Sequence, residues 1–265
     1  MSDADKFILD FYRDVAKKFG LSGQSTMKDP TIRMAEEDFF CAEINRFIEE
    51  RGHYPIIADV GCGNGHLLSV LRQRFPKCDL IGIEFTPELL ELALERNISN
   101  AVILHGDIRN LENLPTKVDI VITERVLINL LNDFDKSHAF SSIKQALKPQ
   151  GRLLMSESFI ETWKNMNAAR KEMRLEPIAQ SKQNRYMTYD NLKELTDIGF
   201  AELKSEFSAH HLSTHFYITR IFHHLVRPEG GKLEQTEFVK FFNHALGPGI
   251  GEYSPIQFRV FEKMF

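Results

Sequence analysis

Short apolar runs alternate along the chain with segments in which apolar residues recur every three or four positions. The runs are rich in β-branched residues and predict buried strands, while the second spacing predicts helices. The expected strands span 56–60, 80–84, 101–104, 118–123, 153–157, 200–207 and 255–261. The expected helices span 66–74, 87–94, 134–147, 191–195, 212–226 and 234–246. Such alternation is typical of an α/β protein.

Two helical patterns precede the first expected strand. Residues 5–20 carry apolar side chains at helical spacing, and Gly20 is suited to end that helix. A second pattern covers 30–50, with Pro30 in its first turn. A doubly wound sheet does not need these helices, so they are expected to form an addition to the core.

Three glycines stand between the first expected strand and the helix that follows it. Gly61, Gly63 and Gly65 alternate with other residues, and without Cβ atoms they let a ligand approach the backbone near the helix N-terminus. The dinucleotide fingerprint would place its third glycine at His66 instead. Asp59 would repel a pyrophosphate but suits an amino group. The loop therefore predicts a nucleotide cofactor without phosphate.

Residues 58–65 (Ala-Asp-Val-Gly-Cys-Gly-Asn-Gly) resemble the cofactor loop of class I S-adenosylmethionine-dependent methyltransferases, and the chain resembles their small-molecule type. The resemblance implies an α/β fold with a doubly wound, seven-stranded, Rossmann-like sheet. It also implies an N-terminal helical lid over residues 1–50 and a methyltransferase domain over 51–265. Within that domain we expect a substrate cover at about 158–187 and a helical insertion at about 212–246, before the last strand.

The resemblance assigns roles to side chains around the loop. Glu84 closes the second strand about 20 residues after the glycines, where a ribose-binding acid belongs. Phe85 is expected on the adenine or else in the core, and Asp107 is expected to accept from the adenine amino group or else to form a turn. Arg33 is expected to pair with the cofactor's carboxylate, or else to be a solvated helix residue. The expected cofactor-binding residues are Asp59, Gly61, Cys62, Gly63, Gly65, Glu84, Phe85, Asp107, Ile108, Glu124 and Arg33.

The segment from Glu124 to Asn129 follows the central expected strand and should face the transferred methyl. It lacks the Asn-Pro-Pro-Tyr and Pro-Cys patterns of two classes of DNA methyltransferase. The net charge of −4, without a run of Lys or Arg, also disfavours a nucleic-acid backbone as partner. The predicted reaction is methyl transfer to an oxygen or nitrogen of a small organic molecule. A tRNA or protein methyltransferase, a non-catalytic binding protein and a nicotinamide-dependent oxidoreductase stay open as alternatives.

Six of the ten histidines lie between 210 and 244. His211 and His215 are four residues apart and could share a helix face, but no carboxylate or cysteine at matching spacing completes a metal site, so no metal is predicted. Imidazole titrates near neutral pH and can take a proton from a substrate hydroxyl. His215 and His211 are therefore the candidate general bases, the alternative being that they pack between helices.

Three cysteines without paired spacing indicate a reducing compartment. The first residues lack the apolar core of a signal peptide, and no apolar run is long enough to span a bilayer. We expect a cytoplasmic protein without a membrane partner. The sequence leaves open whether the chain forms a homodimer and which acceptor it methylates.

Overall fold

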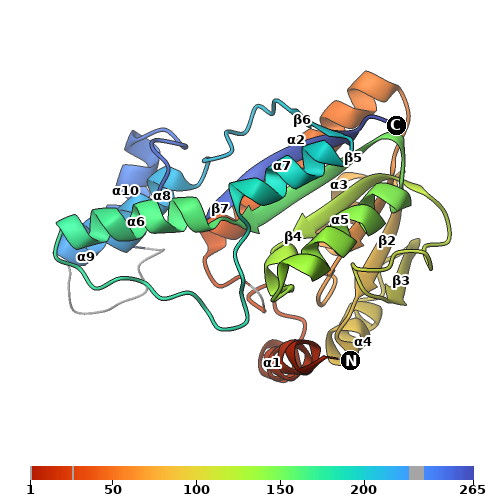
Figure 1. Cartoon of the computed structure of the whole chain (residues 1–265), viewed down its shortest axis with the longest axis horizontal. Coiled ribbons are helices and arrows are strands. Elements are labelled where there is room, and N and C mark those ends of the chain that lie inside the picture. The colour runs from red at the N-terminus through yellow and green to blue at the C-terminus, as the bar shows by residue number, and fades with distance from the viewer. Residues whose placement is uncertain (1, 26, 227–235) are drawn as a thin grey trace.

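The computed structural model describes residues 2–25, 27–226 and 236–265, and within them seven strands form one sheet (Figure 1). The strand order is β3-β2-β1-β4-β5-β7-β6, with β7 antiparallel to both of its neighbours and the other pairs parallel. The predicted fold class is confirmed. The strands are β1 (Ile56–Val60), β2 (Asp79–Glu84), β3 (Ala101–His105), β4 (Val118–Glu124), β5 (Leu147–Ser158), β6 (Phe200–Leu203) and β7 (Ile256–Lys263).

Helices cover both faces of this sheet (Figure 1). The α-helices are α1 (Asp3–Phe19), α2 (Pro30–Arg51), α3 (His66–Arg74), α4 (Pro87–Glu95), α5 (Asp133–Ala146), α6 (Ile160–Glu172), α7 (Tyr189–Asp197), α8 (Ser213–Tyr217), α9 (His223–Val226) and α10 (Glu237–Ala245). Two short turns of other helix types are the 3-10 turn η1 (Leu127–Asn129) and the π-helical turn η2 (Ile218–Phe222).

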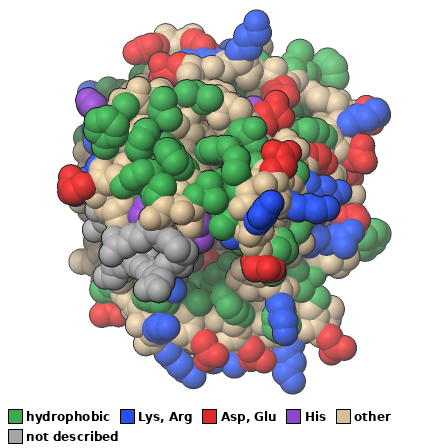
Figure 2. All heavy atoms as spheres, turned by 90° about the vertical axis from the view of Figure 1, so that its left-hand side faces the viewer, with side chains coloured by type: hydrophobic (Ala, Val, Ile, Leu, Met, Phe, Trp, Pro, Cys, Tyr) green, Lys and Arg blue, Asp and Glu red, His purple; other side chains and the backbone are tan. Residues whose placement is uncertain are grey.

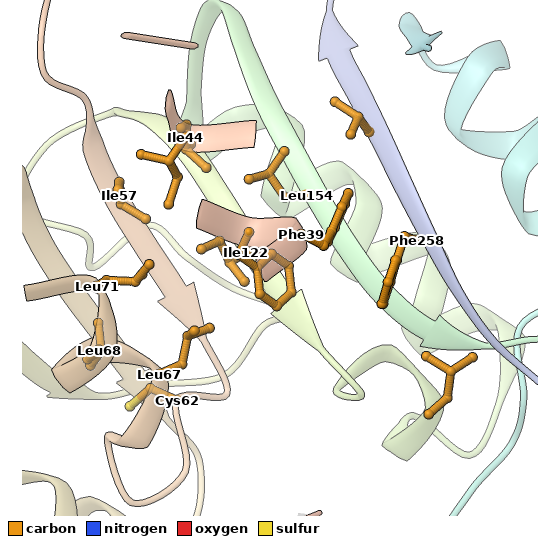
Figure 3. Packing of buried hydrophobic residues seen from close by; sticks show 14 of the residues in the cluster. Phe39, Ile44, Ile57, Cys62, Leu67, Leu68, Leu71, Ile122, Leu154 and Phe258 are labelled. Carbon is orange, nitrogen blue, oxygen red and sulfur yellow. The ribbon is translucent and has the colours of Figure 1, made fainter. Parts of the chain in front are cut away.

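Successive residues of the central strands point to opposite faces and join two separate cores. On one face, Ile57 and Ile122 pack with α2 and α3 (Figure 3). There Phe39 of α2 stacks on Phe258 of β7, with ring centroids 4.7 Å apart. On the other face, Val121 packs with residues of α5 and α7. Because β1 and β4 are buried on both faces, they carry apolar residues at most positions, interrupted by Asp59 in β1 and by Asp119 in β4.

The two N-terminal helices have different roles. Helix α2 carries buried Phe39, Phe40, Ile44 and Phe47 into one of the cores, so it covers the sheet. Helix α1 packs beside α4 instead, where Arg13 pairs with Glu88. The residues of α1 belong to neither core, whereas Met27 of the connector after it packs against the core that α2 joins.

Three segments differ from their predicted form. The expected turn at 148–152 lies within β5, whose pairing with β4 shifts between Val118 and Ile120 and whose Gln150 has a φ of +60°. The expected polar cover at 158–187 begins with helix α6, and β6 ends at Leu203. In the described part of the chain, no helix is both long and apolar enough to cross a membrane.

The helical insertion forms one end of the molecule beside α6 (Figure 1). Its aromatic side chains pack on each other, as where Phe222 lies 5.1 Å from Phe238 between ring centroids. Figure 2 faces this end and shows hydrophobic side chains gathered on it. Phe241 is 64% exposed and Ile250 is 55% exposed.

Candidate active site

A cavity of about 790 Å³ opens at the carboxyl ends of β1, β2 and β4. Its volume lies toward the upper end of the range of roughly 300–1,000 Å³ found for small-molecule sites, and its position is where open α/β sheets bind ligands. Helix α1, the connector after it and the first turn of α2 close one side, and η2 and residues 183–184 contribute to the wall. Predicted site residues that line it are Asp59, Gly61, Cys62, Gly63, Glu84, Phe85, Asp107, Ile108, Glu124 and Arg33.

The glycine loop forms the floor beside β1. Gly61 and Cys62 donate their N–H groups to the carbonyl of Ile83, at 2.7 and 3.0 Å. Gly61 has a φ of +78°, and a Cβ there would lie 2.3 Å from Val126 Cγ2. Gly63 has a φ of +56°, but a Cβ there would meet no atom within 4 Å. Gly65, which is not among the lining residues, is the N-cap of α3.

Two buried carboxylates stand at this loop. Glu84 accepts from the N–H of Gly63 at 2.8 Å and from that of Thr86 at 2.7 Å, and burial raises its pKa. Asp59 Oδ2 is buried and has no hydrogen-bond partner among the described residues. Burial first, and then Glu124 and Glu84, raise the pKa of Asp59 well above its usual value. An ammonium group placed here would satisfy an otherwise orphaned acid.

Asp107, just after the carboxyl end of β3, already has a charged partner. Its Oδ2 lies 2.5 Å from Arg109 Nη2, and the guanidinium of Arg109 lies 5.8 Å from the Phe85 ring centroid. Arg109 also pairs with Asp5 of α1 at 2.9 Å. The sequence analysis did not find Arg109, because only the fold brings α1 to it. Asp107 keeps lone pairs for a further donor.

Arg125 follows β4 with a φ of +59° and pairs with Glu124 and with Glu36 of α2. Burial raises the pKa of Glu36 to about 7 although Arg125 opposes the shift. Arg33, one turn before Glu36 on α2, donates to the carbonyl of Met27 at 3.0 Å, and burial lowers its pKa. This cluster joins the start of α2 to the expected methyl-transfer end of β4, and the sequence analysis missed its Arg125–Glu36 pair.

The structure does not bring the two candidate bases to the cavity. His215 is buried, its Nε2 lies 2.8 Å from Asp29 Oδ2, and its Nδ1 lies 2.9 Å from Asn243 Nδ2. It therefore braces Asp29, which caps α2 through the N–H groups of Thr31 and Ile32. The ring of His211 packs against Phe207, and burial lowers its pKa. The predicted common helix face is wrong, because α8 begins at Ser213 and His211 lies in the turn before it.

Glu157, at the end of β5, holds the segment after β4. Its carboxylate accepts from the N–H groups of Val126 and Leu127 at 3.0 Å each and from that of Ile128 at 3.4 Å. The side chain is fully buried, and burial raises its pKa to about 7 in spite of these bonds. Ionised or not, it fixes η1 at the edge of the cavity.

Glu157 gives the fold a pH dependence. Between about pH 4.5 and 7 the unfolded chain ionises this group while the folded chain keeps the proton, so rising pH favours unfolding. Between pH 4.5 and 7, the unfolding free energy of wild type is expected to fall by about 3 kcal/mol relative to that of Glu157→Gln. Above pH 7 the difference between the two proteins should stay constant. Urea unfolding at several pH values measures this difference, with Glu172→Gln on the surface as control. A difference that does not change with pH would contradict the assignment.

Comparison with known proteins agrees with this geometry. A family model described as a methyltransferase domain matches residues 55–223. The chain belongs to this methyltransferase family. The family assignment agrees with the S-adenosylmethionine-dependent methyltransferase activity and the S-adenosyl-L-methionine cofactor that the resemblance implied.

Among curated relatives, the methyltransferase is 25% identical over 169 residues to a malonyl-[acyl-carrier protein] O-methyltransferase from a Methylovorus species. That match covers 61% of this chain and 53% of the relative, so the chain spans about half the length of the curated relatives it matches. The solved magnesium protoporphyrin IX methyltransferase from Synechocystis has a TM-score of 0.59 at 15% identity, covering 97% and 99% of the two chains. The N-methyltransferase NodS from Bradyrhizobium japonicum has a TM-score of 0.55 at 12% identity, covering 95% and 97%. These two structures share the fold of the methyltransferase.

The residues around the cavity fit S-adenosylmethionine. The orphaned Asp59 Oδ2 suits its ammonium group, and the open space over Gly63 leaves room for the ligand against the backbone. Glu84 keeps acceptor capacity on both oxygens beside the bonds it already accepts. The floor carries acidic side chains and suits a ligand with a cationic end.

Proposed function

We propose that this methyltransferase transfers the methyl group of S-adenosylmethionine to an oxygen or nitrogen of a small organic molecule. The observation that carries the proposal is the wall of the cavity. Residues of α1, of the connector after it and of η2 line the same partly open cavity as Glu124 and Arg125, and this cavity has room for a small acceptor. Such a wall suits a small molecule better than the surface of a tRNA or a folded protein.

In this proposal the chain contributes binding and position. The bound cofactor supplies an electrophilic methyl group on a sulfonium sulfur. Glu84 accepts from the ribose hydroxyls, Asp59 takes the ammonium group, Asp107 accepts from the adenine amino group and Arg33 pairs with the carboxylate. Helix α1 covers these groups, and Tyr12 of that helix donates to Asn129 Oδ1 at 2.9 Å across the cavity wall. Covering the site excludes water and holds the acceptor in line with the methyl.

A carboxyl oxygen is the acceptor atom that the relatives suggest, since their printed name is that of an O-methyltransferase acting on a malonyl carrier protein. A carboxylate is already ionised at neutral pH and needs no general base. That agrees with a cavity to which neither His211 nor His215 contributes.

The size of the acceptor is tested with cofactor carrying a labelled methyl group and a heat-treated extract of the source cells. Ultrafiltration then separates small molecules from RNA and protein, and mass spectrometry identifies the labelled atom. We expect label in the small-molecule fraction, on oxygen or nitrogen. Label found only in RNA or protein, or in neither fraction, would contradict the proposal.

A further inference from the structure

Arg220 stands in the middle of η2, the π-helical turn between α8 and α9, and lines the cavity. Single π-helical turns inserted between α-helical segments frequently occur at functional sites. The position lies in the helical insertion, far along the sequence from the glycine loop. The cofactor-binding residues expected from the sequence do not include it.

The guanidinium of Arg220 has unused donors. Among residues 2–25, 27–226 and 236–265, it donates no hydrogen bond, and its closest acidic atom is Asp29 Oδ2 at 3.6 Å. That oxygen already faces His215 Nε2 at 2.8 Å, while Asp29 Oδ1 accepts from the first turn of α2. Asp29 therefore lies beside Arg220 without occupying its donors, since a hydrogen bond of 3.6 Å is too long.

The side chain is nevertheless held in place. Its guanidinium lies 5.7 Å from the ring centroid of Phe216, one turn earlier, in a cation–π contact. Its backbone carbonyl accepts from Arg170 of α6. The side chain is 22% exposed, so most of it is withdrawn from bulk water. A fixed, partly desolvated guanidinium with free donors is prepared for a ligand at small entropic cost.

A different arginine serves the cofactor in the proposed function, which leaves Arg220 for the acceptor. Arg33 lies one turn into α2 from Asp29, and Glu124 is the acid that most affects its pKa. Arg220 comes from the insertion and meets Asp29 from the other side. Lys28 adds a further cation to the same wall, and Gln183 and Asn184 add neutral polar groups.

We propose that Arg220 binds an oxyanion of the methyl acceptor, a carboxylate or a phosphate, through paired hydrogen bonds from its guanidinium. The planar fork of arginine matches both groups in a bidentate manner. The inference rests on the proposed function and narrows its substrate class to anionic molecules. Behind it, His215 contacts the Asp29 carboxylate that flanks Arg220, and Asn243 contacts His215.

Binding to enzyme saturated with S-adenosylhomocysteine tests this proposal without a turnover assay. The probes are hexanoate, phenyl phosphate and neutral hexanamide, titrated by calorimetry. We expect at least one of the two anions to bind wild type about tenfold or more tightly than the amide does. Whether hexanoate or phenyl phosphate binds identifies the source of the oxyanion. Equal binding of anions and amide, or no binding of either anion, would overturn the proposal.

The variants are Arg220→Gln and Arg220→Lys, with exposed Lys171→Gln on α6 as a matched loss of one positive charge. We expect Arg220→Gln to weaken the anion about tenfold or more, Arg220→Lys to weaken it less, and Lys171→Gln to leave it unchanged. All three should bind S-adenosylhomocysteine as wild type does. If Arg220→Gln weakens S-adenosylhomocysteine as much as it weakens the anion, Arg220 is a cofactor ligand and the proposal is wrong.

Different results would contradict the small-molecule acceptor and the role of Arg220. Label that reaches only RNA or protein contradicts the small-molecule acceptor, whatever Arg220 does. Wild type that methylates a small molecule but shows no preference for the anions contradicts only the role of Arg220. Thermal unfolding of each variant without ligand shows that the fold is intact before binding is compared.

Discussion

Replacing Glu84 by glutamine is expected to weaken S-adenosylhomocysteine binding by about 30-fold, which corresponds to about 2 kcal/mol. The wild-type carboxylate accepts from the N–H groups of Gly63 and Thr86, one on each oxygen, and Glu84 lines the cavity, so its remaining lone pairs are available to the ribose hydroxyls. Glutamine has one acceptor oxygen, and its NH₂ group faces one of these two backbone donors. The substitution therefore removes hydrogen bonds to the ribose and also disturbs the glycine loop.

Isothermal titration calorimetry with S-adenosylhomocysteine measures this effect. Glu91→Gln, on the exposed side of α4, makes the same chemical change nearby and should bind the ligand as wild type does. Thermal unfolding without ligand separates loss of binding from loss of fold. An unchanged dissociation constant for Glu84→Gln would remove Glu84 from the cofactor site.

Substitution by alanine is expected to lower mainly the stability of the fold at Gly61 and mainly the affinity for the ligand at Gly63. In Gly61→Ala the new Cβ would lie 2.3 Å from Val126 Cγ2, at a φ of +78°, so the unfolding free energy should fall by about 3 kcal/mol. In Gly63→Ala the Cβ meets no protein atom, and the left-handed φ alone should cost about 1 kcal/mol. That Cβ instead occupies space beside the backbone where the ligand would lie, so ligand affinity should fall about tenfold or more.

Urea unfolding and calorimetric titration of both variants check this pair. Each variant serves as the control of the other, because the chemical change is the same and the positions are two residues apart. Equal loss of stability in both would mean that the cavity side of Gly63 is not open. Full ligand affinity in Gly63→Ala would place the cofactor away from this loop.

Much of the fold could be predicted because each strand and helix carries its own local signal. The glycine loop and Glu84 were found for the same reason, since their spacing along the chain encodes their spacing across two parallel strands. Where no local signal exists, the three-dimensional fold decides which side chains become partners. Arg109 and Arg125 gain their partners from α1 and α2, and neither pairing leaves a pattern in the sequence.

The helical insertion is the part of the chain where sequence patterns predicted the positions of side chains least well. Spacing placed His215 on a helix correctly, whereas His211 lies in the turn before α8. The two rings pack against Asp29 and Phe207 and do not line the cavity. Arg220 lies in the cavity wall on η2, a π-helical turn, and such a turn shifts the angular positions of the residues after it relative to a regular α-helix. Hydrophobic periodicity gives no warning of such a turn.

The contacts of α1 bear on ligand exchange. Arg13, in the middle of the helix, pairs with Glu88, and Asp5, near its start, pairs with Arg109; both pairs have partly exposed side chains, and such pairs are individually weak. The connector behind it is anchored by backbone carbonyls, since Asn64 donates to those of Gly20 and Ser22. If these ion pairs and the Tyr12–Asn129 hydrogen bond open while the connector stays bound, α1 would uncover the cavity. Raised ionic strength would then speed ligand exchange without loosening the loop beneath, and a helix of this kind can limit turnover more than the chemical step does.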